Sequence, residues 1–326
     1  MEKKHLKFPS EKITMDKFFK KTGIVWALVL LCIVMSFASP AFLTYANITS
    51  ILKQSAINGI LAVGMTLVMI SGGIDLSIGS VVAFCCVSAA YFSKMDTFLA
   101  VPFIVSALIG ALIGLVNGLG ISYIGFPPFI MTLSTMTAVR GLILLITDSK
   151  SVFSLPKKFL AIANNYWLGV PILVWFFIAI VILGHILLKA TVFGKWIYAV
   201  GGNERAANLS GINTPKVKTL LYVICGLLAG ITGALLASRI SSGNPSVADG
   251  YEMDAVAAAV IGGVSMSGGS GTMFGTLIGT LVLGVMRNSF DIMGLSSYYQ
   301  QIMKGVIILI SVFIDICAKK KKIKKI

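Results

Sequence analysis

The segment Lys189–Lys218, KATVFGKWIYAVGGNERAANLSGINTPKVK, is the only long polar interruption between two strongly hydrophobic halves of this 326-residue chain. It carries five Lys or Arg residues and a single acid, Glu204. Long apolar runs precede and follow it. Because basic residues collect in loops on the cytoplasmic side of a bilayer, the segment is interpreted as a cytoplasmic loop between two membrane-embedded halves.

The composition supports a membrane protein. The chain is 57% hydrophobic and 12% charged, and its mean hydropathy is +0.93, which leaves too little polar surface for a soluble globule. A segment that crosses about 30 Å of hydrocarbon needs roughly 20 apolar residues, and it is helical unless it closes a barrel. Strands with alternating polarity are absent from the sequence, so an all-α polytopic membrane protein is predicted.

Apolar runs predict about ten transmembrane helices. They lie near residues 23–39, 52–71, 77–93, 98–121, 128–147, 169–188, 217–238, 254–264, 272–291 and 298–317.

The charges give an independent prediction of topology. Formal charge is +4 over residues 1–22, +4 over 189–218 and +6 over 319–326. All three fall on one side of the membrane if six spans precede the central loop, which predicts cytoplasmic termini. The predicted domains are a basic segment 1–22, one transmembrane domain 23–318 and a basic tail 319–326. The overall charge of +15 sits at the ends of apolar runs, so nucleic acid is not an expected partner.

The two halves share a plan. Leu108–Ile113 recurs as Leu277–Val282, and each half contains a GxxxGxxxG strip, which lets a neighbouring helix backbone approach closely. Each strip follows a glycine-rich interruption, at Gly72–Asp75 and at Gly262–Gly269. Such strips are common in polytopic proteins, but matched helix breaks in repeated halves indicate a transport pathway. The predicted halves are 45–188 and 217–317, joined by a loop at 189–216.

Asp75 is the conspicuous charge within an apolar region. A carboxylate that faces lipid costs roughly 2.5 kcal/mol or more, so it is expected to face protein or water. One interpretation is that it caps a half-helix by accepting from the amides of Ser77 and Ile78. The other is that it lines a polar path.

The central loop contains the signals of a short helix. Asn203 is a good N-cap, Glu204 suits the first turn, and Gly211 suits the left-handed residue after a helix end. A helix of two turns is unstable alone in water, so it must pack on this protein's own helix ends or on a soluble partner.

Sequence motifs for catalysis or for phosphate, metal or disulfide chemistry were not found. The chain has no GxxxxGK[ST], HExxH, GxSxG or CxxC, and its five cysteines lie in apolar runs without ligand spacing. We therefore expect no enzyme activity, metal or cofactor on this chain. One alternative function is a secondary transporter driven by H⁺ or Na⁺ through Asp75, which has no obvious acidic or His partner in the sequence.

Several stretches of the sequence form one recognisable set: Ala62–Val68, Ser71–Ser80, Met131–Met136 with Arg140 and Gly141, Gly202–Ala207, Leu209–Ile212, Gly250–Ala255 and Ser296–Gln300. In these stretches the chain resembles the membrane-spanning permease subunits of bacterial ATP-binding-cassette sugar importers, most closely the ribose-type branch. The resemblance covers most of residues 45–315. The lysine-rich tail is not part of the matching set.

The resemblance implies a monosaccharide permease in the bacterial cytoplasmic membrane. It implies three partners: a second permease subunit (a homodimer or a close paralogue), an ABC ATPase that binds ATP and Mg, and an extracytoplasmic sugar-binding protein. The implied ATPase-coupling helix contains Asn203, Glu204, Ala206, Ala207, Leu209, Ser210 and Gly211. Binding-protein docking is expected at Arg239, Asp249 and Glu252, and a translocation path at Met65, Thr66, Asp75, Ser77, Thr132 and Ser134. The sugar, and the choice between homodimer and heterodimer, stay open.

Overall fold

The computed structural model describes residues 15–95 and 98–323. Residues 1–14 of the predicted basic N-terminal segment and 324–326 of the basic tail lie outside them. Within the described residues the chain is almost entirely helical, with one antiparallel hairpin in which Tyr166 pairs with Pro171. The elements are α1 (Met15–Ala38), α2 (Tyr45–Ile70), α3 (Ile78–Lys94), α4 (Val101–Leu119), a π-helical turn η1 (Gly120–Ile124), α5 (Pro128–Thr147), α6 (Lys157–Asn164), β1 (Tyr166–Trp167), β2 (Val170–Pro171), α7 (Ile172–Ala190), α8 (Val192–Gly202), α9 (Glu204–Leu209), α10 (Thr214–Ile240), α11 (Tyr251–Ile261), α12 (Met273–Ile292) and α13 (Ser297–Ile323).

Each of the ten predicted apolar runs coincides with a helix, although some bounds differ. For example, α2 begins at Tyr45 and not near 52, because the Thr44 hydroxyl accepts from the amide of Asn47 and caps the helix there. Six of the described helices are long and apolar enough to cross a membrane: α2, α4 with η1, α5, α7, α10 and α12. The full number of spans and the side on which the termini lie remain predictions.

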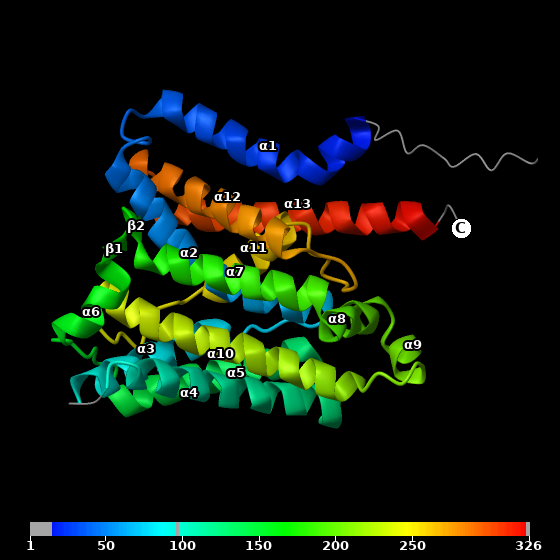
Figure 1. The fold of residues 1–326 in the computed structure, drawn as a ribbon, viewed down its shortest axis with the longest axis horizontal. Coiled ribbons are helices and arrows are strands. Elements are labelled where there is room, and N and C mark those ends of the chain that lie inside the picture. Colours follow the sequence, from blue (N-terminus) through cyan, green and yellow to red (C-terminus); the bar gives the residue numbers. More distant parts are fainter. Residues whose placement is uncertain (1–14, 96–97, 324–326) are drawn as a thin grey trace, which may run out of the picture.

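The helices run roughly side by side between two ends of the molecule (Figure 1). The helices α8 and α9, the start of α1 and the end of α13 lie toward one end, and α6 and the hairpin lie toward the other. This grouping agrees with the charge pattern, which places the central loop and both termini on one side. Helices α2 and α10 form much of the core. In the most apolar 18-residue stretch of each helix, 78% of the residues of α2 and 72% of those of α10 are buried.

The glycine strips bring helix backbones together, as predicted. A side-chain carbon at Gly110 of α4 would overlap the carbonyl oxygen of Gly226 in α10. In the other half, a carbon at Gly275 of α12 would overlap the carbonyl oxygen of Gly262, directly after α11. Each strip therefore permits a contact between backbones that any larger residue blocks.

We expect Gly110→Ala to destabilise the fold. The added methyl group has no room at the α4–α10 contact, and overpacking of this kind costs about 1–3 kcal/mol. Gly305→Ala is the matched control, because a carbon at Gly305 of α13 has nothing within 4 Å. Thermal unfolding of the purified variants in detergent should show a lowered midpoint for Gly110→Ala alone. Equal midpoints would contradict the close approach of α4 and α10.

Both predicted helix breaks are present, and they touch. Helix α2 ends at Ile70 and helical structure resumes at Ile78, while α11 ends at Ile261 and α12 begins at Met273. The amide of Gly269 in the second break donates to the carbonyl of Ile70 at the end of α2, at 2.8 Å. The interruptions of the two halves thus form one joined region in the fold.

Helix α11 begins inside the molecule. After α10, the segment 241–250 leads from the end at which α6 lies back toward the middle of the structure, where α11 starts (Figure 1). In the first turn of α11, the carboxylate of Glu252 lies directly against Gly79, which is in the first turn of α3. A side-chain carbon at Gly79 would overlap this carboxylate. Two helices that begin after non-helical segments, α3 and α11, therefore meet in the interior.

Candidate functional site

The predicted short helix in the central loop is α9. The side chain of Asn203 accepts from the amide of Ala206 at 3.0 Å and caps its start. Gly211 follows the helix with a φ of +86°, a left-handed conformation that favours glycine. These contacts confirm the local geometry expected from the sequence.

One face of α9 is held by the protein, and the other is free in the described structure. Ala207 is buried, and Glu204 forms an ion pair with Lys218 of α10, at 2.5 Å. Leu209, in contrast, is 91% exposed. The helix therefore packs on its own subunit, as one sequence interpretation expected, and it leaves Leu209 exposed at its end. Contact with a soluble partner stays a prediction.

Helix α8 connects α9 to the two helix breaks. A side-chain carbon at Gly201 would overlap the carbonyl oxygen of Ile70 and would lie 2.6 Å from the amide nitrogen of Gly269. A carbon at Gly268 would lie 3.0 Å from Gly72. We call the backbone contacts among Gly72, Gly201 and Gly268–Gly269 the glycine junction. No side chain separates α8 from the two breaks at this junction, so their backbones pack directly on one another.

Asp75 heads a buried chain of hydrogen bonds. Its Oδ1 accepts from the amide of Ser77 at 3.0 Å and from the Ser77 hydroxyl at 2.6 Å. Asn117 of α4 donates to that hydroxyl oxygen at 2.9 Å and accepts from Thr135 of α5 at 2.6 Å. The expected bond from the amide of Ser77 is present, but the expected bond from the amide of Ile78 is not, and Ser77, the N-cap residue of α3, provides no side-chain cap. The carboxylate instead links the break to α4 and α5 through Ser77 and Asn117. Its Oδ2 has no hydrogen-bond partner.

The six residues expected along the path differ in their burial within the described structure. Asp75 and Ser77 are in contact. Met65, Thr66 and Thr132 are each 0% exposed inside the subunit, with Thr66 bonded to Thr276 of α12 at 2.7 Å. Only Ser134 is exposed, on α5. Helix α5 is the least buried of the six long apolar helices, because only 17% of its most apolar 18-residue stretch is buried inside the subunit.

The residues expected to dock a binding protein fall in two places. Arg239 lies in the last turn of α10. Asp249 and Glu252 line a cavity together with Arg140 of α5. The guanidinium Nη1 of Arg140 donates to the carbonyl oxygens of Pro245 and Val247, both at 2.9 Å, and so fixes the segment that enters α11.

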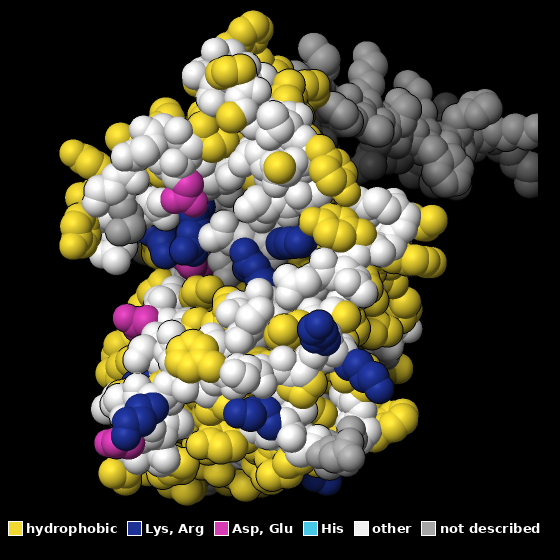
Figure 2. Space-filling view, turned by 90° about the vertical axis from the view of Figure 1, so that its left-hand side faces the viewer, with side chains coloured by type: hydrophobic (Ala, Val, Ile, Leu, Met, Phe, Trp, Pro, Cys, Tyr) yellow, Lys and Arg dark blue, Asp and Glu magenta, His cyan; other side chains and the backbone are white. Residues whose placement is uncertain are grey.

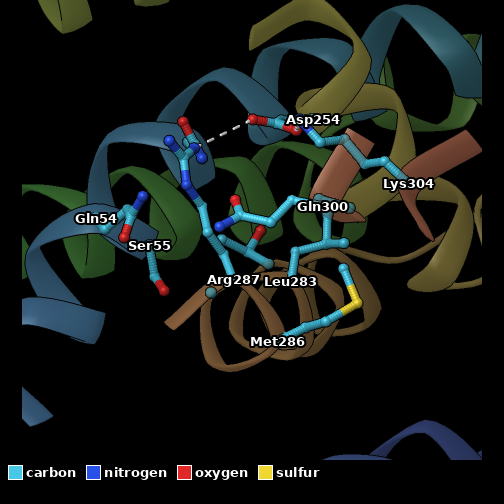
Figure 3. Close-up of a pocket in the computed structure, with 12 residues that line it drawn as sticks. Gln54, Ser55, Asp254, Leu283, Met286, Arg287, Gln300 and Lys304 are labelled. Carbon is cyan, nitrogen blue, oxygen red and sulfur yellow. Dashed lines mark ion pairs between the residues drawn. The ribbon is translucent and has the colours of Figure 1, made fainter. Parts of the chain in front are cut away.

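A second polar group, not identified from the sequence, surrounds Asp254 of α11 (Figure 3). Its carboxylate pairs with Lys304 of α13 at 2.5 Å and with Arg287 of α12 at 3.8 Å. The space beside it is about 20 Å³, enough for a single water but not for a sugar. The group ties α11 to α12 and α13. In the sequence, Lys304 and Arg287 are charged residues within apolar helices, and this pattern could have indicated a buried partner of opposite charge.

The end of the molecule that carries α6 and the hairpin is hollowed near its centre (Figure 2). Lys and Arg side chains gather in the hollow with Asp or Glu beside them, whereas hydrophobic side chains cover much of the rest of this view. A mixed-charge hollow suits a polar partner or a polar solute better than lipid.

Comparisons with known proteins now define the class. Residues 47–312 match the family described as the permease component of the branched-chain amino acid transport system. The chain is 42% identical to the ribose import permease protein RbsC of Bacillus subtilis, over 97% of this chain and 98% of that one. It is 40% identical to RbsC of Haemophilus influenzae, over 91% and 93%. It is 34% identical to the L-arabinose transport system permease protein AraH of Escherichia coli, over 96% of each. No solved structure matches the chain.

The chain therefore belongs to this family of membrane transport permeases. It is a multi-pass protein of the cytoplasmic membrane, in agreement with its apolar helices.

Proposed function

We propose that this protein is the membrane-spanning subunit of an ATP-binding-cassette importer and forms the pathway for ribose or a similar monosaccharide. The observation that carries the proposal is α9, a capped helix that presents Leu209 outward and is joined through α8 to the breaks of both halves. The sequence lacks a phosphate-binding loop. A separate ATPase, which binds ATP and Mg, therefore supplies the energy and docks on α9.

The full-length similarity to two RbsC proteins favours ribose, and the similarity to AraH keeps other pentoses open. A second permease subunit, identical or closely related, covers the exposed face of α5. This face belongs to the least buried of the six long apolar helices. It carries Ser134 and Thr137, whose hydroxyls donate to carbonyls of α5 itself and can still accept a hydrogen bond from a neighbouring subunit. The sugar-binding protein docks at the hollowed end shown in Figure 2.

Within this pathway, the Asp75 chain of hydrogen bonds holds the wall in place. It connects the break before α3 to Thr135 on α5, next to the exposed Ser134. Thr132 is buried on the same helix, whereas Thr66 joins α2 to Thr276 of α12. The solute passes between the two subunits along the face of α5 that is exposed in the single subunit, and Asp75 positions that helix.

Co-purification tests the proposal. The tagged permease should bring down an ABC ATPase when the two are expressed together in the bacterial membrane, and ATP hydrolysis should rise when the sugar-loaded binding protein is added. The basic tail 319–325 serves topology or contact with anionic lipid, so its removal should leave this association intact. Recovery of the permease without any ATPase under mild detergent would contradict the proposal.

Asp75→Asn separates the importer from an ion-coupled transporter. We expect the variant to lose at most a modest part of ATP-driven uptake, because asparagine keeps the oxygen that accepts from Ser77. In an ion-coupled carrier, the same change removes the titrating group and abolishes uptake. The measurement is ribose uptake by proteoliposomes with and without a proton or sodium gradient, with Asp148→Asn, an exposed carboxylate change, as the control.

A further inference from the structure

A cavity of about 350 Å³ lies between α3, α5 and the segment that enters α11. This volume falls within the range of about 300–1,000 Å³ found for small-molecule sites. Several of its lining side chains are polar and come from parts of the chain that are distant in sequence: Ser80, Thr137, Arg140, Asp249 and Glu252. Met136 and Leu144 add an apolar wall.

The polar groups are held in place before any ligand arrives. Arg140 is anchored through Nη1 to two carbonyls, which use only part of the five N–H donors of a guanidinium. The Glu252 carboxylate is 8% exposed and lies against Gly79. A site whose donors and acceptors are already fixed loses less entropy when it binds.

Ser80 supplies an independent sign of a ligand. Its side chain is 1% exposed, it lines the cavity, and its Oγ has no hydrogen-bond partner. Buried hydroxyls are nearly always hydrogen-bonded in folded proteins, and those that are not call for an explanation. A hydroxyl group of a bound solute would complete the missing bond.

The charges indicate the kind of ligand. One guanidinium faces two carboxylates, so an anion meets net repulsion. A neutral polyhydroxylated molecule fits, because its O–H groups donate to Asp249 and Glu252 while its oxygens accept from Arg140 and Ser80. Its C–H surface can lie on Met136 and Leu144. The cavity thus has the complementary groups for a monosaccharide, unlike the space beside Asp254, which is too small.

We propose that this cavity, lined by Ser80, Arg140, Asp249 and Glu252, binds the sugar in transit through the permease. The inference rests on the proposed function and adds the site at which the solute is held. Arg140 lies seven residues before the end of α5 at Thr147, about 10 Å along the helix at 1.5 Å per residue. The cavity therefore lies on the α5 wall between that end of the helix and the Asp75 chain, with Ser80 and Glu252 buried and Thr137 and Asp249 exposed.

Ribose uptake by the full complex in proteoliposomes tests this site. We expect Glu252→Gln to lower the maximal uptake rate at least tenfold. The concentration of sugar-loaded binding protein that gives half-maximal uptake should change little. Ser80→Ala should lower that rate about threefold or more, while its unfolding midpoint is unchanged or higher, because the variant removes an unpartnered buried hydroxyl. Asp148→Asn, an exposed carboxylate outside the cavity, is the matched control and should retain normal uptake.

Cysteine protection gives a readout that does not depend on transport. Thr137→Cys places a thiol at the cavity in a background with Cys32 and Cys317 replaced by serine, since Cys85, Cys86 and Cys225 are buried. Millimolar D-ribose should slow its alkylation at least threefold in the isolated permease, whereas Lys150→Cys, at an exposed position, should react at one rate throughout.

The outcomes are distinguishable. If the wild-type complex does not take up sugar, the proposed function fails. If it does, but Glu252→Gln and Ser80→Ala transport normally and ribose gives no protection, the cavity is not the sugar site and the proposed function stands. Protection by sodium alone would identify an ion site and overturn the inference.

Discussion

We expect Leu209→Asp to abolish ATP-driven uptake and to release the proposed ATPase from the permease. Leu209 is 91% exposed at the end of a capped helix, and burial of a leucine side chain contributes about 1.5–3 kcal/mol. Since each 1.4 kcal/mol is a factor of ten in affinity, loss of this contact alone weakens docking by roughly 10–100-fold. A carboxylate left in the apolar groove of the partner weakens it further. The measurement is the amount of ATPase that co-purifies, together with ribose uptake by proteoliposomes.

The matched control for this change is Leu168→Asp. Leu168 is also an exposed leucine, at 76%, and it lies in the hairpin turn at the opposite end of the molecule. We expect this variant to retain the ATPase and normal ATP hydrolysis. If both variants keep the ATPase, α9 is not the docking helix. If both lose it, the effect is not specific to that helix.

Gly201→Ala should disable transport from a position that touches neither sugar nor ATPase. The new methyl group would overlap the carbonyl oxygen of Ile70 and crowd the amide of Gly269. Overpacking costs about 1–3 kcal/mol, and here it must also push α8 away from the two breaks. We expect a lowered unfolding midpoint and at least a tenfold loss of uptake, with ATP hydrolysis no longer stimulated by the binding protein.

The neighbouring glycine provides the control. A side-chain carbon at Gly202 has nothing within 4 Å, so Gly202→Ala makes the same chemical change one residue away without a clash. It should keep the wild-type midpoint and uptake. Equal behaviour of the two variants would show that the glycine junction does not transmit motion between α8 and the breaks.

Features set by local chemistry were predictable from the sequence. The N-cap at Asn203 and the left-handed Gly211 follow from short-range preferences. The two breaks were predictable because clustered glycines weaken a helix, and the close contact at Gly110 follows from its GxxxGxxxG pattern. In each case the signal lies within a few residues of the structure that it produces.

Features set by packing were not predictable in the same way. Asp249 is exposed, as expected for a docking residue, but Glu252 is buried, and both line a cavity with Arg140, more than 100 residues earlier in the chain. The reason is that the segment 241–250 turns back into the molecule before α11. The order of apolar and polar residues in this segment does not predict that turn. The expected path likewise named buried residues such as Met65 and Thr132, since the apolar pattern does not distinguish a core-facing side from a solute-facing side.

Reconstituted uptake tests the central claim most directly. Purified permease is placed in liposomes with or without its ATPase and ribose-binding protein, and the entry of labelled D-ribose is followed. The proposed function predicts uptake only when ATP and both partners are present, without dependence on a proton or sodium gradient. Gradient-driven uptake by the permease alone would contradict it.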